Sequence, residues 1–182
     1  MNFNDIDLDE QNRLLNVAKS AEEEFSSDQD KEKLIKVYES VFCRKQPLRS
    51  NSRARKLALL YIESDRKKDA LKFLDSCVRH QLMPLESIRT IQADLYKKEG
   101  QYYRAIEFYL VASLAEEHGA FFHDYDRIAK KIKRCIKKVK WGDQEVGYLV
   151  YLIRNHIENN NFSEVDLVDS YRCFLKEKGI EY

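Results

Sequence analysis

The sequence is poor in the residues that interrupt helices: its 182 residues include only two prolines and five glycines. Charged residues make up 35% of the chain and aromatic residues 12%, a mixture typical of a helical protein that folds in water. A disordered chain would contain fewer aromatic side chains, because it has no core to hold them. The composition therefore indicates an ordered, helix-rich fold.

The sequence also lacks long apolar segments. No run approaches the roughly 20 apolar residues that a membrane-spanning helix needs. The first residues, MNFNDIDLDEQ, are acidic and have no apolar core of the kind found in secretory signal peptides. We therefore expect a cytoplasmic protein that has no membrane partner.

Cysteine is present, but not at the spacings of metal or redox motifs. The four cysteines are Cys43, Cys77, Cys135 and Cys173, and no two of them form a C-x-x-C pair. The spacing therefore indicates neither a zinc knuckle nor a thioredoxin-type redox pair. Each cysteine lies within a helical pattern, so we expect buried free thiols, which favour a reducing compartment.

Apolar residues recur at helical spacing along almost the whole chain, and no strand pattern competes with them. Asp7 is the expected N-cap of the first helix. Ser27 and Asp30, before the second helix, have the spacing of a capping box, and so do Ser163 and Asp166 before the last. The pattern predicts an all-α fold of about nine helices, joined by short turns into antiparallel hairpins.

Two stretches of the sequence repeat each other at an offset of 35 residues. ALLYIESDRKKDALKFLDSC, residues 58–77, and ADLYKKEGQYYRAIEFYLVA, residues 93–112, share five of twenty positions. Five aligned sites explain the repeat, although not all of them are identical in the two copies: Ala58 with Ala93, Tyr61 with Tyr96, Asp65 with Gly100, Ala70 with Ala105, and Cys77 with Ala112. Small residues at the first and fourth sites let two helices approach closely, the tyrosine fills the space beside them, and the third site falls in the tight turn.

This pattern resembles the tetratricopeptide repeat (TPR). The small residue, the tyrosine three residues later and an alanine before a bulky fourth neighbour are present, as in Ala70 with Leu74 and Ala105 with Tyr109. The chain departs from the family in its period, 35 residues rather than about 34. It also departs in the family tryptophan, replaced by Ala54 and Arg89, and in the terminal proline, two places late at Pro84.

The TPR resemblance implies a single domain over 1–182 that coils into a short right-handed superhelix. It would consist of an acidic hairpin over 1–45, two repeats over 51–118 and C-terminal helices over 122–182. Such arrays bind rather than catalyse, and hold a peptide or a partner helix in a concave groove. Carried over by position, the groove residues are Ser52, Arg55, Leu59, Ile62, Glu63, Ser87, Thr90, Asp94, Lys97 and Lys98. Each of them is also compatible with ordinary solvated helix surface.

Charge is distributed unevenly along the chain. Residues 1–30 hold nine acids and two bases, whereas seven of the eleven residues of KKIKRCIKKVK, 130–140, are basic. This helix could present a solvated face, dock the acidic N-terminus, bind nucleic-acid phosphates or bind an acidic protein. It lacks the interleaved aromatic residues that stack on single-stranded bases. The predicted basic patch comprises Lys130, Lys133, Arg134, Lys137 and Lys138.

Evidence for an enzyme is sparse. EEHGAFFHDYD brings together four metal-capable residues, His118, His123, Asp124 and Asp126, and similar His–Asp pairs occur in the all-helical HD-type metal hydrolases. Such a site would also need residues from elsewhere in the chain, and a turn between helices collects His and Asp as caps. No phosphate loop, nucleophile elbow or H-E-x-x-H motif occurs. We therefore predict a non-catalytic adaptor without cofactor or metal. The alternatives are a nucleic-acid-associated protein and an HD-type hydrolase.

Overall fold

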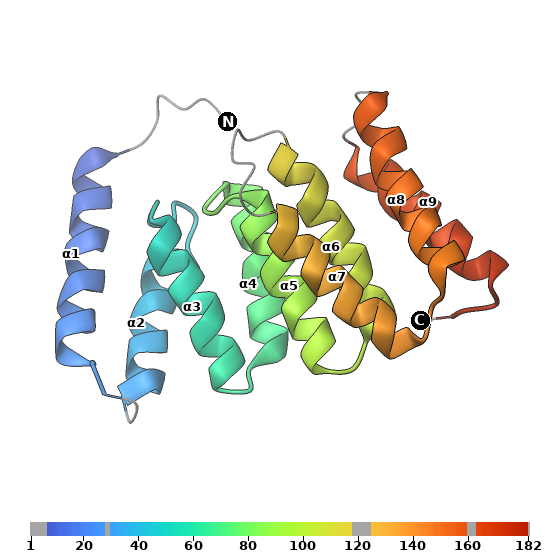
Figure 1. Cartoon of the computed structure of the whole chain (residues 1–182). Coiled ribbons are helices and arrows are strands. Elements are labelled where there is room, and N and C mark those ends of the chain that lie inside the picture. Colours follow the sequence, from blue (N-terminus) through green and yellow to red (C-terminus); the bar gives the residue numbers. More distant parts are fainter. Residues whose placement is uncertain (1–6, 28–29, 118–124, 160–162, 182) are drawn as a thin grey trace. The chain divides into compact units, whose positions relative to one another are not determined.

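The computed structural model of the chain describes residues 7–27, 30–117, 125–159 and 163–181. Within these segments the protein is all-α, which confirms the predicted fold class (Figure 1). None of the described helices is long and apolar enough to cross a membrane. The helices are α1 Leu8–Glu24, α2 Lys31–Phe42, α3 Asn51–Glu63, α4 Lys67–His80, α5 Leu85–Lys98, α6 Tyr102–Glu117, α7 Tyr125–Val139, α8 Asp143–Glu158 and α9 Glu164–Glu177.

The helices belong to two compact units. The N-terminal unit, Met1–Pro84, contains α1 to α4, and the C-terminal unit, Leu85–Tyr182, contains α5 to α9. The boundary at Pro84 separates the two stretches that repeat each other in sequence. A single superhelical domain over 1–182 therefore stays a prediction, and each unit is described by itself.

Small buried residues and a cluster of aromatic rings form the core of the N-terminal unit. Ala58, Ala70 and Cys77, three of the repeat positions, are fully buried. Phe73 of α4 lies edge-on to Phe42 of α2 and to Tyr61 of α3, with ring centroids 5.9 and 6.1 Å apart. The small side chains let the helices approach, and the rings fill the space beside them.

A charged side chain joins three helices of the N-terminal unit. Glu22 of α1 accepts hydrogen bonds from the Tyr38 hydroxyl of α2 and, at 2.8 Å, from the Arg53 guanidinium of α3. Burial raises the pKa of the Glu22 carboxyl, but these two hydrogen bonds outweigh it, so its pKa lies below the ordinary value of 4.5. Ionised Glu22 therefore stabilises the packing of α1 on α2 and α3.

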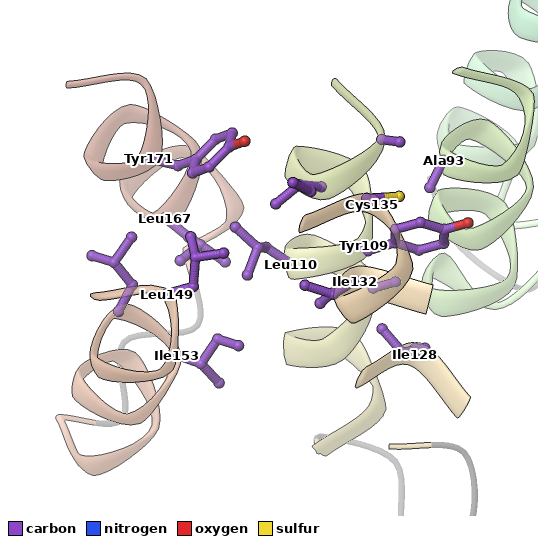
Figure 2. Close-up of a cluster of buried hydrophobic side chains, with 14 of the residues drawn as sticks. Ala93, Tyr109, Leu110, Ile128, Ile132, Cys135, Leu149, Ile153, Leu167 and Tyr171 are labelled. Carbon is purple, nitrogen blue, oxygen red and sulfur yellow. The ribbon is translucent and has the colours of Figure 1, made fainter. Parts of the chain in front are cut away.

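In the C-terminal unit, α6 carries core side chains in two directions (Figure 2). Leu110 points toward Leu149 of α8 and Leu167 of α9, whereas Tyr109 lies with Cys135 of α7. Near the end of α7, the Trp141 ring contacts aromatic rings of α6 and α9, with centroids 5.5 Å from Tyr103 and 5.6 Å from Phe174.

Ion pairs fix α9 to three other helices of the C-terminal unit. Arg89 of α5 pairs with Glu164 at 2.6 Å, Glu107 of α6 with Arg172 at 3.0 Å, and Glu145 of α8 with Lys178, just beyond α9, at 2.9 Å. The Arg89 guanidinium also lies over the ring of Phe108, 5.7 Å from its centroid. This cation–π contact adds to the packing of α5 on α6.

The turns that connect α3 with α4 and α5 with α6 have the same backbone geometry, although the two hairpins belong to different units. Asp65 and Gly100 both adopt the left-handed conformation, with φ of 57° and 76°. The next amide donates to the carbonyl of the repeat tyrosine, Arg66 to Tyr61 at 2.7 Å and Gln101 to Tyr96 at 2.9 Å. The helices before the turn end at Glu63 and Lys98, and those after it begin at Lys67 and Tyr102, again 35 residues apart.

Two of the three predicted caps are formed. Asp7 accepts hydrogen bonds from the amides of Asp9 and Glu10, and Ser163 accepts one from the Asp166 amide at 3.2 Å. The capping box predicted at Ser27 and Asp30 is wrong. The Ser27 hydroxyl donates to the Asp30 carboxylate at 2.7 Å, and Asp30 also accepts from Lys33, so it makes no capping bond to α2.

Replacement by alanine is expected to have opposite effects on stability at two glycines, Gly100 in the turn and Gly147 in a helix. Gly100→Ala is expected to lower the free energy of unfolding by about 1 kcal/mol, because alanine is strained at a positive φ. A Cβ there meets no atom within 4 Å, so the loss reports on the backbone alone. Gly147→Ala, inside α8 and equally unhindered, should raise stability by about 0.5–1 kcal/mol. Urea unfolding followed by circular dichroism measures both, and equal tolerance of the two changes would contradict the turn geometry.

The lowered pKa of Glu22 predicts a pH-dependent stability. Glu22→Gln is expected to lower the free energy of unfolding by about 1 kcal/mol at pH 7. The difference from wild type should shrink as the pH falls below 4.5 through the folded pKa, because the wild-type carboxyl is then protonated too. Urea unfolding at pH 7 and at pH 3 measures this, with exposed Glu23→Gln as the control. A loss that is the same at both pH values would exclude the proposed charge effect.

Candidate functional site on the faces of α3, α5 and α7

The groove residues predicted on α3 lie at the surface of the N-terminal unit. Leu59 is 41% exposed, which is high for a large apolar side chain, and Ile62 beside it is half-buried. Arg55 is exposed, and Glu63 pairs with Lys31 of α2 at 3.1 Å. Together with exposed Ser52, these residues form a mixed apolar and charged face that a ligand can reach.

The residues predicted on α5 differ in their accessibility. Lys98 is exposed, and Ser87 and Lys97 are half-buried. Thr90 is only 5% exposed, and its hydroxyl donates to Glu86 at 3.3 Å, so it is not part of an accessible face. This hydrogen bond lies within α5, since Glu86 is one helical turn before Thr90.

Asp94 connects α5 to two other helices of the C-terminal unit. Its carboxylate accepts hydrogen bonds from the Tyr109 hydroxyl of α6 and from the Lys131 ammonium of α7. Lys131 also lies over the Tyr109 ring, 5.6 Å from its centroid. Burial, reinforced by the hydrogen bond to Asp94, raises the pKa of the Tyr109 hydroxyl, which stays protonated. Asp94 therefore has a structural role beside any role in binding.

The basic patch predicted on α7 is exposed in full. Lys130, Lys133, Arg134, Lys137 and Lys138 all lie on the outer surface of the C-terminal unit, and so does Lys140 after the helix. The opposite side of the helix is buried in the core, and Figure 2 shows three of its residues there, Ile128, Ile132 and Cys135.

An ion pair joins the basic helix α7 to α5, which carries part of the predicted groove. Lys131 of α7 binds Asp94 of α5. Burial raises the pKa of the Cys135 thiol of α7 to about 11, and the Lys97 ammonium partly offsets this rise. Sequence analysis did not single out Lys131, because its carboxylate partner lies 37 residues away.

The expectation of four buried thiols is wrong for two of them. Cys77 and Cys135 are buried, and burial raises the pKa of Cys77 to about 12. Cys43 is exposed because it follows the last turn of α2, and Cys173 is exposed because it lies on the outer side of α9. None of the four forms a disulfide.

The metal-binding alternative lies mainly outside the described residues. His118, His123 and Asp124 belong to the segment 118–124, which the structure leaves out, and the side chain of Asp126 is not described either. Among the described residues, no group of three or more His, Cys, Asp or Glu side chains could hold a metal ion. The hydrolase hypothesis therefore stays a prediction.

Comparison with known proteins assigns no relative. No family model, curated protein or solved structure matches the chain. The candidate sites therefore depend on the sequence and on the geometry of the described residues.

The position of Asp94 predicts a stability coupling with Tyr109. Asp94→Ala is expected to cost about 1–3 kcal/mol of unfolding free energy, because it leaves the buried Tyr109 hydroxyl without its acceptor. Tyr109→Phe removes the hydroxyl, so Asp94→Ala then leaves no hydroxyl without an acceptor. The loss of unfolding free energy in the double variant should therefore be smaller, by about 1 kcal/mol, than the sum of the losses in the two single variants. Urea unfolding of the four proteins measures the coupling. Strict additivity would show that the hydrogen bond contributes nothing.

Proposed function

We propose that the protein is a non-catalytic, TPR-like adaptor that binds a peptide or helix of another protein. The observation that supports this proposal best is the shared turn of α3–α4 and α5–α6. The residue in the left-handed conformation, the hydrogen bond to the tyrosine carbonyl and the helix ends all recur after 35 residues. Repeated helical hairpins leave the exposed faces of their first helices free to bind extended partners.

The face of α3 is the stronger of the two proposed binding faces, each of which lies within its own unit. Leu59 exposes an apolar side chain beside half-buried Ile62, and Arg55 adds a cation on the same helix. Partner segments bind best where an apolar contact is surrounded by polar groups. The expected partner therefore offers an apolar side chain to Leu59 and a carboxylate to Arg55.

The second proposed face, on α5, offers mostly charge. Lys97 and Lys98 remain accessible at the end of α5, whereas Asp94 is occupied by Tyr109 and Lys131. An acidic residue of the partner suits this end. Four free thiols also support the proposal that the protein works in a reducing, cytoplasmic compartment.

Peptide binding by single-site variants tests this proposal. A peptide that binds the wild-type chain is selected from an array of mixed apolar and acidic sequences, and its affinity is measured by calorimetry. Arg55→Glu and Leu59→Ser should each weaken binding by about tenfold or more, since each removes a contact at the proposed face. Lys97→Glu tests the face of α5 separately, and unchanged binding of an acidic peptide by this variant would remove Lys97 from the proposed face.

Arg79→Glu is the matched control, because Arg79 is an exposed cation on α4, a helix that carries none of the predicted groove residues. It should leave the affinity unchanged. If Arg55→Glu and Leu59→Ser bind the selected peptide as tightly as wild type does, the proposed face on α3 is wrong.

A further inference from the structure

The positive charge of the C-terminal unit is concentrated in one helix. Residues 85–182 contain sixteen basic and sixteen acidic side chains, so the unit as a whole is neutral. Eight of its sixteen basic side chains nevertheless lie within 127–140. A neutral unit with half of its cations on α7 and the residue that follows it has a strongly positive surface there, and this surface attracts anions.

Among the described residues, most of these cations have no ion-pair partner. Arg127 pairs with Glu86 at 3.1 Å, and Lys131 pairs with Asp94. In the part of the chain that the structure describes, no ion pair involves the other six, which are all exposed. These six, which we call the cationic stripe, are Lys130, Lys133, Arg134, Lys137, Lys138 and Lys140.

The cationic stripe contains like charges at helical neighbour positions. Arg134 is three or four residues from Lys130, Lys137 and Lys138, and each such pair of cations repels and weakens the helix. The repulsion disappears when an anion with several charges binds across the stripe. The arrangement therefore favours a polyanionic ligand over a single small anion.

The chemistry of the surrounding surface decides which polyanion fits best. The apolar side of α7 is buried, Ile128, Ile132 and Ile136 included, so the helix cannot insert into a membrane. The large apolar side chains exposed in the described part of this unit are Val150, Tyr151 and Val165, on α8 and α9. A peptide would thus find no apolar anchor on α7, whereas a phosphate backbone needs only the cations.

We infer that the cationic stripe of α7 binds the phosphate backbone of a double-stranded nucleic acid, without reading its base sequence. From Lys130 to Lys138 the stripe is about 12 Å long, similar to the width of the major groove of a duplex. A helix laid across the groove can therefore reach phosphates on both strands. Trp141, which follows the stripe directly in the sequence, is packed against Tyr103 and Phe174 and is not free to stack on bases.

Fluorescence anisotropy with the full chain and a labelled DNA duplex of mixed sequence tests the inference. A duplex of about 20 base pairs offers two helical turns. The stripe variant carries Lys133→Gln, Arg134→Gln, Lys137→Gln and Lys138→Gln, which keep good helix formers in place. The control variant carries Lys19→Gln, Lys36→Gln, Lys68→Gln and Lys72→Gln, four exposed lysines of the N-terminal unit with the same total charge.

Wild type and the control variant should bind the duplex, and their affinity should fall steeply between about 50 and 200 mM salt. The stripe variant should bind about 100-fold more weakly or worse at the low-salt end, and its salt dependence should decrease by about three to four in log–log slope. Its circular dichroism spectrum should match that of wild type, so that misfolding does not explain the loss.

Several results would overturn the inference. Wild type could fail to bind the duplex, or the stripe and control variants could bind it equally. Stripe-dependent binding of a glutamate-rich peptide, or of vesicles with anionic lipid, without binding of the duplex would assign the stripe to another partner. Tighter binding of a single strand of equal length would contradict the preference for a duplex. None of the four substituted residues lies on the proposed faces of α3 and α5, so the adaptor proposal is tested separately.

Discussion

The hydrogen bond from the amide after a left-handed residue to the carbonyl of a tyrosine five residues earlier sets the geometry of both central hairpins. It closes the turns from Tyr61 to Arg66 and from Tyr96 to Gln101. The turn is short because one residue, Asp65 or Gly100, adopts a positive φ. Each of the four paired helices carries one alanine of the repeat, and Ala58, Ala70, Ala93 and Ala105 are fully buried.

The two proposed binding surfaces follow from which sides of the helices these contacts use. On α3, the buried side carries Ala54, Leu57 and Ala58, so Arg55 and Leu59 face outward. On α7, all the described large apolar residues lie on the buried side, and only Val139 among them is half-buried. The exposed side is therefore cationic. The first surface offers an apolar contact and the second offers charge alone, which is why we assign them partners of different chemistry.

The sequence predicted those features that depend on neighbours along the chain. Helical spacing identified the helices, and the paired small residues identified the turn shared by Asp65 and Gly100. The cap at Asp7 also forms, because it needs only the next few amides. The exposure of the basic patch followed from the period of its apolar residues.

Features that depend on distant residues could not be predicted. Lys131 is bound to Asp94, so it does not contribute to the cationic stripe, and nothing near it in the sequence indicates this. Cys173 and Tyr171 both lie on α9, but only the side of the helix that carries Tyr171 faces α6. There the Tyr171 hydroxyl donates to the Tyr103 carbonyl at 3.1 Å. Even a local prediction failed at Ser27 and Asp30, because Lys33 and the serine hydroxyl bind the carboxylate instead.

Amide hydrogen exchange, measured by NMR on the full chain, tests most directly whether the two central hairpins are built alike. The amides of Arg66 and Gln101 are expected to exchange slowly, like amides within the adjoining helices, because each donates a hydrogen bond to a tyrosine carbonyl. Exchange of either amide at the rate of an open turn would contradict the equivalence of the hairpins, and with it the repeat on which the proposed function depends.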